Sequence, residues 1–194
     1  MCTGSRDIFI GVGGGGCSIV GRAYLDSCIE GPTVAINTDS DGLRRCSVKK
    51  KVLIGAQSCR GRGCYGDSFL GRLAVFESRE TLENLIVGHE RIVLFAGLGG
   101  GTGTGATPEI GRIAGGLGLH RLAVVMMPFS FEGRGEVAKA GRTELVKYTE
   151  EVVAVDLQQF IQRAPQNTRM CKIICQAQQA LLDLLKKKLK INEP

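Results

Sequence analysis

The sequence predicts an α/β protein with three layers, in which helices cover both faces of a mostly parallel sheet. Short apolar segments alternate along the chain with longer segments whose apolar residues recur every three or four positions. The apolar segments are continuous rather than alternating with polar residues, which is typical of strands buried on both faces of a parallel sheet. Two of these segments run directly into glycine-rich stretches, as strands do where they reach a ligand-binding edge.

The elements follow one another in a regular order. Six strands are expected at residues 7–12, 33–36, 52–54, 92–96, 122–127 and 152–155. Helices are expected from residue 13 to about 28 and at 68–87, 109–117, 135–150, 157–163 and 169–190. Residues 57–67, rich in Gly and Arg, are expected to form a loop.

Composition indicates one soluble globular domain. The chain has 194 residues, of which 43% are hydrophobic and 23% charged. The net charge of +6 lies largely in two short clusters, at 49–51 and 186–190, and the chain has no Trp, three Tyr and seven Phe. Because material for stacking on bases is scarce, we expect no nucleic-acid partner and read the clusters as solvated surface.

Eight cysteines are unevenly spaced and include no CxxC pair, and only His89 and His120 are available beside them. This spacing is poor for a metal site, and we expect reduced thiols without disulfides. No signal peptide and no apolar run of membrane-spanning length is visible. We therefore expect a cytoplasmic protein without membrane contact.

The stretch at 97–108, GLGGGTGTGATP, is the strongest functional signal. Glycine permits a close approach of the backbone to a ligand, and a helix start behind it supplies N–H donors for an anion. The hydroxyls of Thr102 and Thr104 are candidates to donate hydrogen bonds to phosphate oxygens. The sequence thus predicts an anion site after the fourth strand.

A second glycine-rich stretch, GVGGGGCS at 11–18, satisfies a GxGxxG pattern. That pattern also occurs in dinucleotide-binding proteins, where Asp39 after the second strand would bind a ribose. A second phosphate-binding loop favours a different nucleotide site, and the absence of GK[ST] excludes a P-loop. An NAD(P)-dependent oxidoreductase remains the alternative from the pattern alone.

Five segments together resemble the GTP-binding domain of the tubulin/FtsZ superfamily, and its FtsZ branch in particular. They are IGVGGGGCSIV at 10–20, AINTD at 35–39, GRGCYGD at 61–67, AGLGGGTGTGATP at 96–108 and PFSFEGR at 128–134. The resemblance covers roughly residues 6–160. It implies a parallel-sheet GTPase domain, Rossmann-like in form, whose ligand is GTP or GDP and is accompanied by Mg²⁺.

The resemblance also implies the roles of individual residues. The first loop and the base edge would be formed by Gly14, Gly15, Gly16, Cys17 and Ser18. The β- and γ-phosphates would be held by Gly100, Gly101, Thr102, Gly103 and Thr104. Gly61 and Gly63 would lie in the loop that senses the γ-phosphate, and Glu132 would accept hydrogen bonds from the ribose. Asp39, Arg134 and Asp156 are the remaining candidates, Arg134 for a phosphate contact and Asp156 for a base contact.

Several departures from the family pattern affect these roles. Ser18 stands where Asn is usual, Tyr65 adds bulk in the γ-phosphate loop, and Glu136 replaces a usual basic residue. We divide the chain into a GTP-binding domain at 1–168 and a helix resembling the family's central helix, with a basic tail, at 169–194. The second domain of the family and its acidic catalytic turn are expected to be absent, and Asp183 and Glu193 match no such motif.

The resemblance therefore implies a guanine-nucleotide-binding protein of cell division or the cytoskeleton, with weak or absent GTP hydrolysis by the chain alone. No catalytic residue is assigned. Self-association, or action on a full-length FtsZ-like partner as a regulator or cap, is expected. The alternatives are a degenerate module that binds no nucleotide and the oxidoreductase.

Overall fold

The computed structural model describes residues 6–191 and is built on a six-stranded sheet with the order β3-β2-β1-β4-β5-β6. The strands are β1 (Asp7–Val12), β2 (Thr33–Asn37), β3 (Lys50–Leu53), β4 (Arg91–Gly97), β5 (His120–Met127) and β6 (Glu151–Asp156). All neighbouring strands are parallel. The predicted α/β fold class with a parallel sheet is therefore confirmed.

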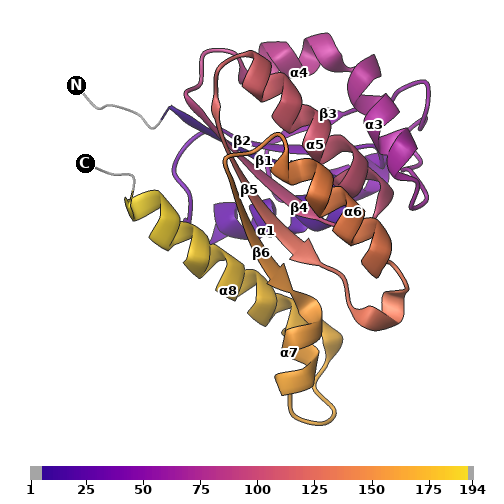
Figure 1. Ribbon diagram of the computed structural model, residues 1–194, viewed down its shortest axis with the longest axis vertical. Coiled ribbons are helices and arrows are strands. Elements are labelled where there is room, and N and C mark those ends of the chain that lie inside the picture. Colours follow the sequence, from indigo (N-terminus) through magenta and orange to yellow (C-terminus); the bar gives the residue numbers. More distant parts are fainter. Residues whose placement is uncertain (1–5, 192–194) are drawn as a thin grey trace.

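Helices cover the sheet on both faces (Figure 1). One face carries α1 (Gly13–Leu25), α2 (Ser40–Arg45), α7 (Leu157–Arg163) and α8 (Met170–Ile191). The other carries α3 (Ser68–Glu77), α4 (Arg79–Ile86), α5 (Gly101–Gly116) and α6 (Gly135–Val146), and a short 3-10 turn lies at Ser130–Glu132. None of the described helices is long and apolar enough to cross a lipid bilayer.

Alternate residues of each central strand enter the two cores. Phe9 of β1 packs in the core beneath α1 and α8, whereas its neighbours Ile8 and Ile10 pack beneath α3 and α5. All three side chains are buried. Because successive side chains of a strand point to opposite faces, continuous apolar strands are what two covered faces require.

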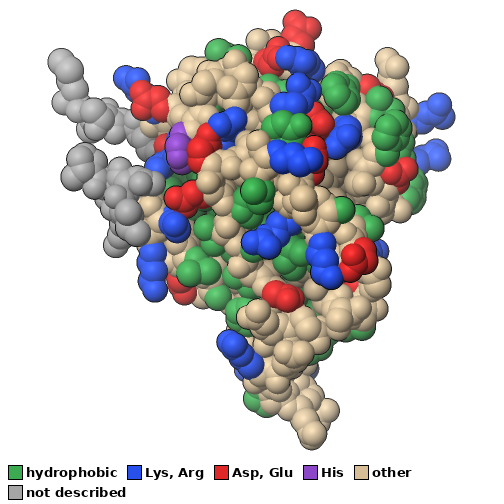
Figure 2. Space-filling model, viewed as in Figure 1, with side chains coloured by type: hydrophobic (Ala, Val, Ile, Leu, Met, Phe, Trp, Pro, Cys, Tyr) green, Lys and Arg blue, Asp and Glu red, His purple; other side chains and the backbone are tan. Residues whose placement is uncertain are grey.

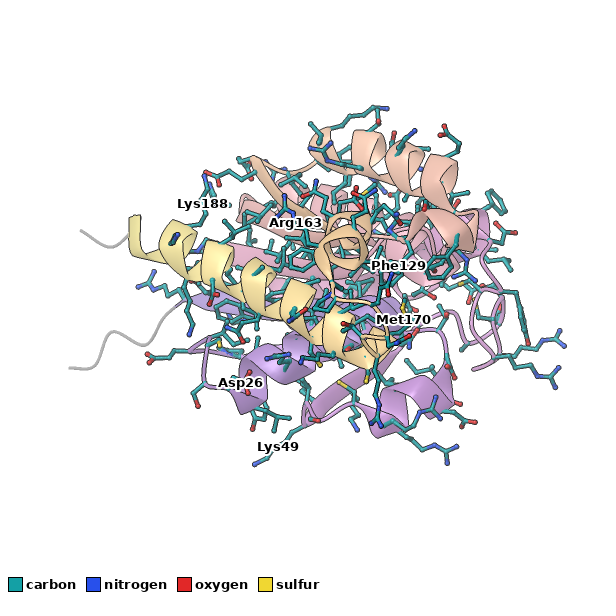
Figure 3. All side chains as sticks on the ribbon, turned by 90° about the horizontal axis from the view of Figure 1, so that it is seen from below. Asp26, Lys49, Phe129, Arg163, Met170 and Lys188 are labelled. Carbon is teal, nitrogen blue, oxygen red and sulfur yellow. The ribbon has the colours of Figure 1, made fainter. Side chains whose placement is uncertain are left out.

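Helix α8 belongs to the same core as the sheet. Its residues Ile173, Ala177 and Leu181 are buried in the cluster that also contains Phe9 and Phe95. Figure 3 shows the helix lying along this face of the molecule, with Met170 near one end and Lys188 toward the other. The division of the chain at residue 168 thus separates segments that share one hydrophobic core, and it stays a prediction.

Helix α5 begins earlier than the sequence predicts. The expected helix started at residue 109, but the structure is helical from Gly101, so most of the glycine-rich stretch forms its first turns. Glycine disfavours helix by itself, yet here it permits close packing: a Cβ on Gly105 would lie 1.9 Å from the carbonyl oxygen of Ser68 in α3. Tertiary packing therefore outweighs intrinsic propensity in this segment.

The segment predicted as one helix at 68–87 is two helices. The break lies at Ser78, whose hydroxyl accepts a hydrogen bond from the Gly55 N–H at 3.3 Å, while Glu77 accepts from the Ser58 N–H at 3.0 Å. The loop after β3 is thus anchored to the point where the helix ends. This long-range contact explains why helical spacing alone did not reveal the break.

The other differences concern boundaries and one short helix. Helix α2 was not predicted, and β3 begins at Lys50 rather than at residue 52. Lys50 and Lys51 are exposed on this edge strand, where lysines discourage pairing with other chains. Figure 2 shows positive and negative side chains interspersed over the face in view.

One ion pair gives a prediction about acid stability. Burial opposes ionisation of Glu150, but hydrogen bonds from the side chain and main chain of Arg121 outweigh it and lower its pKa to about 2, from 4.5. A depressed carboxyl pKa stabilises the fold above the unfolded value, and the contribution is lost as pH falls from about 4.5 toward 2. Glu150→Gln should therefore unfold more easily at neutral pH.

In thermal unfolding, the Tm of the same variant should fall less steeply between pH 5 and 2 than the Tm of the parent chain. Glu30, an exposed carboxylate in the loop before β2, provides the matched control as Glu30→Gln. If the stability of Glu150→Gln and that of the parent chain fell equally steeply between pH 5 and 2, this role of the Arg121–Glu150 ion pair would be contradicted.

Candidate nucleotide-binding site

The candidate site lies where strand order reverses. Strands β2 and β3 lie to one side of β1, and β4, β5 and β6 lie to the other, so the carboxyl ends of β1 and β4 meet at a switch point. Val12 is in register with both Ile36 of β2 and Ala96 of β4. The two glycine-rich stretches that follow β1 and β4 are therefore brought side by side, as the sequence predicts.

The helices that begin at this edge differ in how they are capped. Aspartate side chains cap three of them: Asp39 caps α2, Asp67 caps α3 and Asp156 caps α7. Helices α1 and α5, which start at the switch point, have Val12 and Gly100 at the N-cap and no side-chain cap. Neither has an acidic residue in its first turn.

The first N–H groups of an α-helix have no acceptor within the helix, and the helix dipole places partial positive charge there. Two such ends lie together at the switch point without a carboxylate side chain to satisfy them. This arrangement is suited to an anionic group that accepts hydrogen bonds from both helices. The donors are main-chain N–H groups, as expected for a site without a P-loop lysine.

Close glycine contacts lock the two loops together. A Cβ on Gly13 would lie 2.9 Å from the Gly103 nitrogen, and one on Gly15 would lie 2.9 Å from the Gly97 Cα. Gly13 also has a φ of +71°, which favours glycine. Backbone therefore packs on backbone between the loops, and larger residues would force them apart.

Gly14 and Gly100 behave differently. Apart from the adjoining residues of the same segment, no atom lies within 4 Å of a Cβ placed on either residue, so both border open space at the helix starts. Gly14 lies at the start of α1 and Gly100 at the start of α5, and we call the open space at these two helix starts the cradle; a side chain on either residue would project into it. Together with the uncapped donors, this space fits a phosphate group.

The hydroxyls of Thr102 and Thr104 are buried within the protein. The Thr102 hydroxyl lies 2.7 Å from that of Thr38, and the Thr104 hydroxyl accepts a hydrogen bond from the Gly99 N–H at 2.8 Å. The exposed fractions of the two residues are 8% and 5%. In this structure the two hydroxyls hold the start of α5 in place, which leaves the main-chain N–H groups as the donors nearest the open cradle.

The predicted acidic residues all accept hydrogen bonds from nearby main-chain N–H groups. Asp39 accepts from Asp41 at 3.0 Å, Asp156 from Gln158 at 2.9 Å, and Glu132 from Phe129 at 3.0 Å. Each carboxylate therefore shapes the chain after β2, β6 or β5. Their predicted contacts with ribose or base stay predictions.

Arg134 lies at the N-cap of α6, with a guanidinium nitrogen 4.0 Å from a Glu132 carboxylate oxygen. Its side chain is 55% exposed and so has freedom to reach an anion. A Cβ on Gly99, between β4 and α5, would lie 3.1 Å from the Arg134 Cβ. Arg134, the candidate for a phosphate contact, thus lies beside the second glycine-rich loop.

The loop at 55–67 reaches the site through Gly61 and Gly63. Both have positive φ, of 73° and 81°. The Gly61 carbonyl accepts from the Ser40 N–H at 2.9 Å, and the Gly63 N–H donates to the Thr38 carbonyl at 3.0 Å. This loop is therefore fastened to the turn after β2, next to the Thr38–Thr102 contact.

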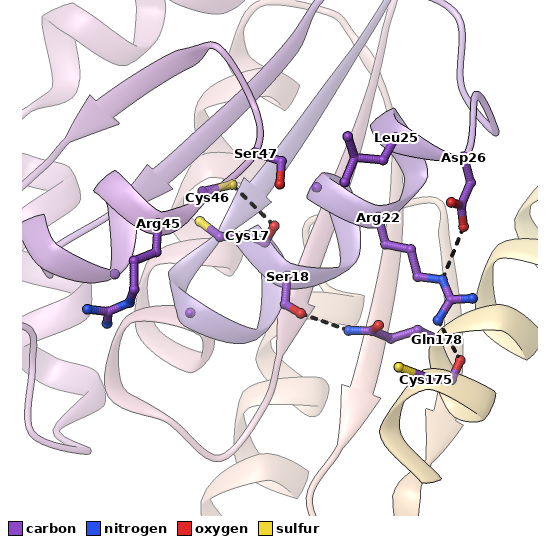
Figure 4. Close-up of a pocket in the computed structure, with 13 residues that line it drawn as sticks. Cys17, Ser18, Arg22, Leu25, Asp26, Arg45, Cys46, Ser47, Cys175 and Gln178 are labelled. Carbon is purple, nitrogen blue, oxygen red and sulfur yellow. Dashed lines mark hydrogen bonds and ion pairs between the residues drawn. The ribbon is translucent and has the colours of Figure 1, made fainter. Parts of the chain in front are cut away.

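A pocket of about 390 Å³ opens beside the first loop (Figure 4). Gly14, Cys17 and Ser18 of α1 line one side of it, and Cys175 and Gln178 of α8 line another. The Gln178 amide nitrogen donates to the Ser18 hydroxyl at 2.9 Å, although the two residues are 160 positions apart. Gln178 is a candidate site residue that sequence reasoning missed.

Cys17 lies in the first loop, where a helix start can lower a thiol pKa. The structure shows the opposite, because burial and the neighbouring Cys46 thiol raise the pKa of Cys17 to about 12. Its sulfur donates to the Ile36 carbonyl at 3.5 Å. Cys17 is therefore a packing residue of the loop rather than a reactive thiol.

Among the described residues, no group of three or more His, Cys, Asp or Glu side chains could hold a metal ion.

A second groove, also of about 390 Å³, lies between α3 and α6 and is lined by Phe69, Val137 and Gly141 among others. It borders α5 at Thr104 and Gly105 and so lies on the opposite face from the Gln178 pocket.

Comparison with known proteins identifies the family. The model of the Tubulin/FtsZ family, GTPase domain, matches residues 7–165. The chain belongs to the tubulin/FtsZ family. This finding confirms the resemblance inferred from the five sequence segments.

Relatives and solved structures agree with this assignment. The chain is 36% identical over 163 residues to cell division protein FtsZ 1 of Pyrococcus furiosus, covering 83% of this chain and 44% of that protein. It is 40% identical over 149 residues to FtsZ of Buchnera aphidicola, covering 75% and 38%. An empty FtsZ dimer from M. jannaschii matches with a TM-score of 0.87 and 32% identity over 95% of this chain and 54% of that one.

This FtsZ-like chain thus spans less than half the length of these two sequence relatives. A more distant structure, CetZ2 from Haloferax volcanii in a GTPγS-bound protofilament, shares the fold at 23% identity with a TM-score of 0.82, over 94% of this chain and 57% of that one. Family membership lends no support to the oxidoreductase alternative.

Proposed function

We propose that this FtsZ-like chain binds GTP or GDP at the switch point of its sheet and serves cell division or another cytoskeletal task in the cytoplasm. The observation that carries the proposal is the pair of uncapped helix starts, α1 and α5, locked together by glycine contacts. They supply main-chain donors for phosphates, with Gly14 and Gly100 bordering the space that the phosphates would fill. A Mg²⁺ ion would arrive with the triphosphate and bind mainly to its oxygens.

The base would lie in the pocket beside Ser18 and Gln178. Gln178 is only 4% exposed, and its amide offers both a donor and an acceptor beside the first loop. Guanine presents donors at N1 and N2 and an acceptor at O6, which a carboxamide can satisfy together with a hydroxyl. Recognition through Gln178 and Ser18 would replace the Asn that is usual at position 18 in the family.

Hydrolysis by the chain alone should be slow. A general base must be free to take a proton from the attacking water. The carboxylates of Asp39, Glu132 and Asp156 near this edge already accept main-chain hydrogen bonds at the starts of helical segments. We expect a full-length FtsZ-like partner to supply the missing group.

An equilibrium titration of the full chain with GTP, GDP, ATP and NAD tests the proposal. We expect binding of GTP and GDP, with Gln178→Leu reducing the preference for guanine over adenine nucleotides. Binding of NAD in preference to GTP, or no binding of guanine nucleotides by the folded chain, would overturn it.

Turnover and sedimentation then distinguish the roles. We expect little phosphate release by the chain alone, and an altered amount of pelleted polymer when it is mixed with a full-length FtsZ. Turnover at the rate of a full-length family member at high protein concentration would contradict the proposed dependence on a partner.

A further inference from the structure

Two buried thiols lie together directly beneath the start of α5. The sulfur atoms of Cys59 and Cys64, both in the loop at 55–67, are 3.6 Å apart. Their exposed fractions are 5% and 3%. Both are free thiols in this structure.

The pair is connected to the phosphate cradle by close contacts. The Cys64 sulfur lies 3.4 Å from the Thr102 hydroxyl and 3.3 Å from the Thr38 hydroxyl, and those hydroxyls are 2.7 Å apart. A Cβ on Gly101 would lie 2.5 Å from the Cys64 Cβ. The thiol of Cys64 is therefore packed against the first two residues of the helix whose N–H groups face the site.

We propose that Cys59 and Cys64 are a reversible disulfide-forming pair that couples oxidation by a peroxide to nucleotide affinity. A disulfide needs sulfur atoms about 2.05 Å apart, so the pair must close by roughly 1.5 Å. The segment between the cysteines is already fastened through Gly61 and Gly63 to the turn after β2. Closure is therefore a local movement of side chains and loop rather than an unfolding step.

The chemistry balances with hydrogen peroxide as the oxidant. One thiolate attacks peroxide, so that a sulfur–oxygen bond forms, the oxygen–oxygen bond breaks, and water leaves after protonation. The second thiol then displaces water from the sulfenic acid, and the disulfide forms. Two thiols thus lose two electrons and two protons, and one peroxide becomes two waters.

Burial raises the pKa of Cys59, an effect that the hydrogen bond from Ser58 partly offsets. The thiolate is the reactive form, so oxidation should be slow at neutral pH and faster as pH approaches 9. A small oxidant such as peroxide suits a pair this deeply covered. Bulky disulfides would react first with the exposed Cys171 and Cys175.

Oxidation should weaken nucleotide binding. A disulfide has no S–H donor, so the Thr38 hydroxyl can no longer accept a hydrogen bond from Cys64. Movement of the Cys64 sulfur also strains the hydrogen bond that the Thr102 hydroxyl donates to it and shifts the contact of Cys64 with Gly101. This consequence rests on the proposed nucleotide site. We expect a loss of affinity for GDP on the order of tenfold, within the usual range for coupling between sites, and its recovery on reduction.

Peptide mapping of the full chain tests the pair independently of nucleotide. Trypsin cleaves after Lys51, Arg60, Arg62 and Arg72, which places the cysteines in separate peptides, 52–60 and 63–72. After peroxide and alkylation of the remaining thiols, we expect these peptides to appear joined, and to separate after dithiothreitol. Absence of the joined mass, with both cysteines still alkylated as thiols, would overturn the proposal.

Titration of reduced and oxidised chain with GDP tests the coupling. Cys59→Ser, and separately Cys59→Ala, should abolish the peroxide effect, while Cys171→Ser, an exposed thiol of α8, should retain it. Equal affinity of the reduced and disulfide-linked chains would overturn the coupling and leave the proposed function intact. If the reduced chain binds no guanine nucleotide, the proposed function fails, and the joined peptides still decide whether the pair forms.

Discussion

Gly103→Ala should disrupt both the fold and the nucleotide site. A Cβ on this residue would lie 2.3 Å from the Gly97 carbonyl oxygen at the end of β4, and neither backbone can easily move. Overpacking of this kind costs about 3 kcal/mol, which corresponds to a fall in Tm of roughly 6–12 °C in a domain of this size. Calorimetry or thermal unfolding measures the first effect.

The second effect of Gly103→Ala is on affinity. Moving the start of α5 away from β4 also moves its N–H groups away from those of α1. Losing two charge-assisted hydrogen bonds of about 1.5 kcal/mol each would lower GTP affinity on the order of a hundredfold. Gly116→Ala, at the other end of α5 with no atom within 4 Å of the new Cβ, is the control that should leave affinity unchanged. Unchanged stability of Gly103→Ala would show that the close loop contact is wrong.

Gly14→Ala should have opposite effects on stability and on binding. Gly14 is an exposed helical residue of α1 with no atom within 4 Å of its Cβ position, so alanine should stabilise the helix by about 0.5–1 kcal/mol. The same methyl group would project into the space bordered by the two helix starts. Affinity for GTP and GDP should therefore fall on the order of tenfold, about the cost of one lost charge-assisted hydrogen bond.

The opposite signs make the Gly14→Ala result informative. A variant that is more stable and binds less tightly cannot owe its lower affinity to partial unfolding. Gly116→Ala again serves as control, because it should gain helix stability without any change in binding. Tighter or equal binding by Gly14→Ala would place the phosphates elsewhere.

The meeting of the two glycine-rich loops could be predicted because their signal is local. Runs of glycine after apolar strands mark both loops, and parallel strand order then brings residues 13–16 and 97–103 together. The predicted start of α5 was wrong because packing on Ser68 offsets the low helix propensity of glycine, and no local sequence pattern reveals that packing. The break at Ser78 escaped prediction for the same reason, since the loop residue Gly55 contacts it.

The chemical detail of the site depends on long-range contacts. The Ser18–Gln178 hydrogen bond joins the first helix to the last, and only the packing of α8 on the sheet places them together. The sequence predicts Thr102 as a phosphate ligand, yet in the structure its hydroxyl contacts Thr38 and Cys64. Asp39 is likewise a helix cap. A short polar residue after a strand can cap a helix or bind a ligand, and the sequence alone does not distinguish the two roles.

Hydrogen–deuterium exchange of the full chain with and without GTP tests the central claim most directly. If the uncapped starts of α1 and α5 hold the phosphates, the amides of residues 13–16 and 100–103 should become protected together, with added protection near Gln178 from the base. The groove between α3 and α6 should exchange as before. Protection confined to that groove, or unchanged exchange at both helix starts under saturating GTP, would contradict the assignment of the site.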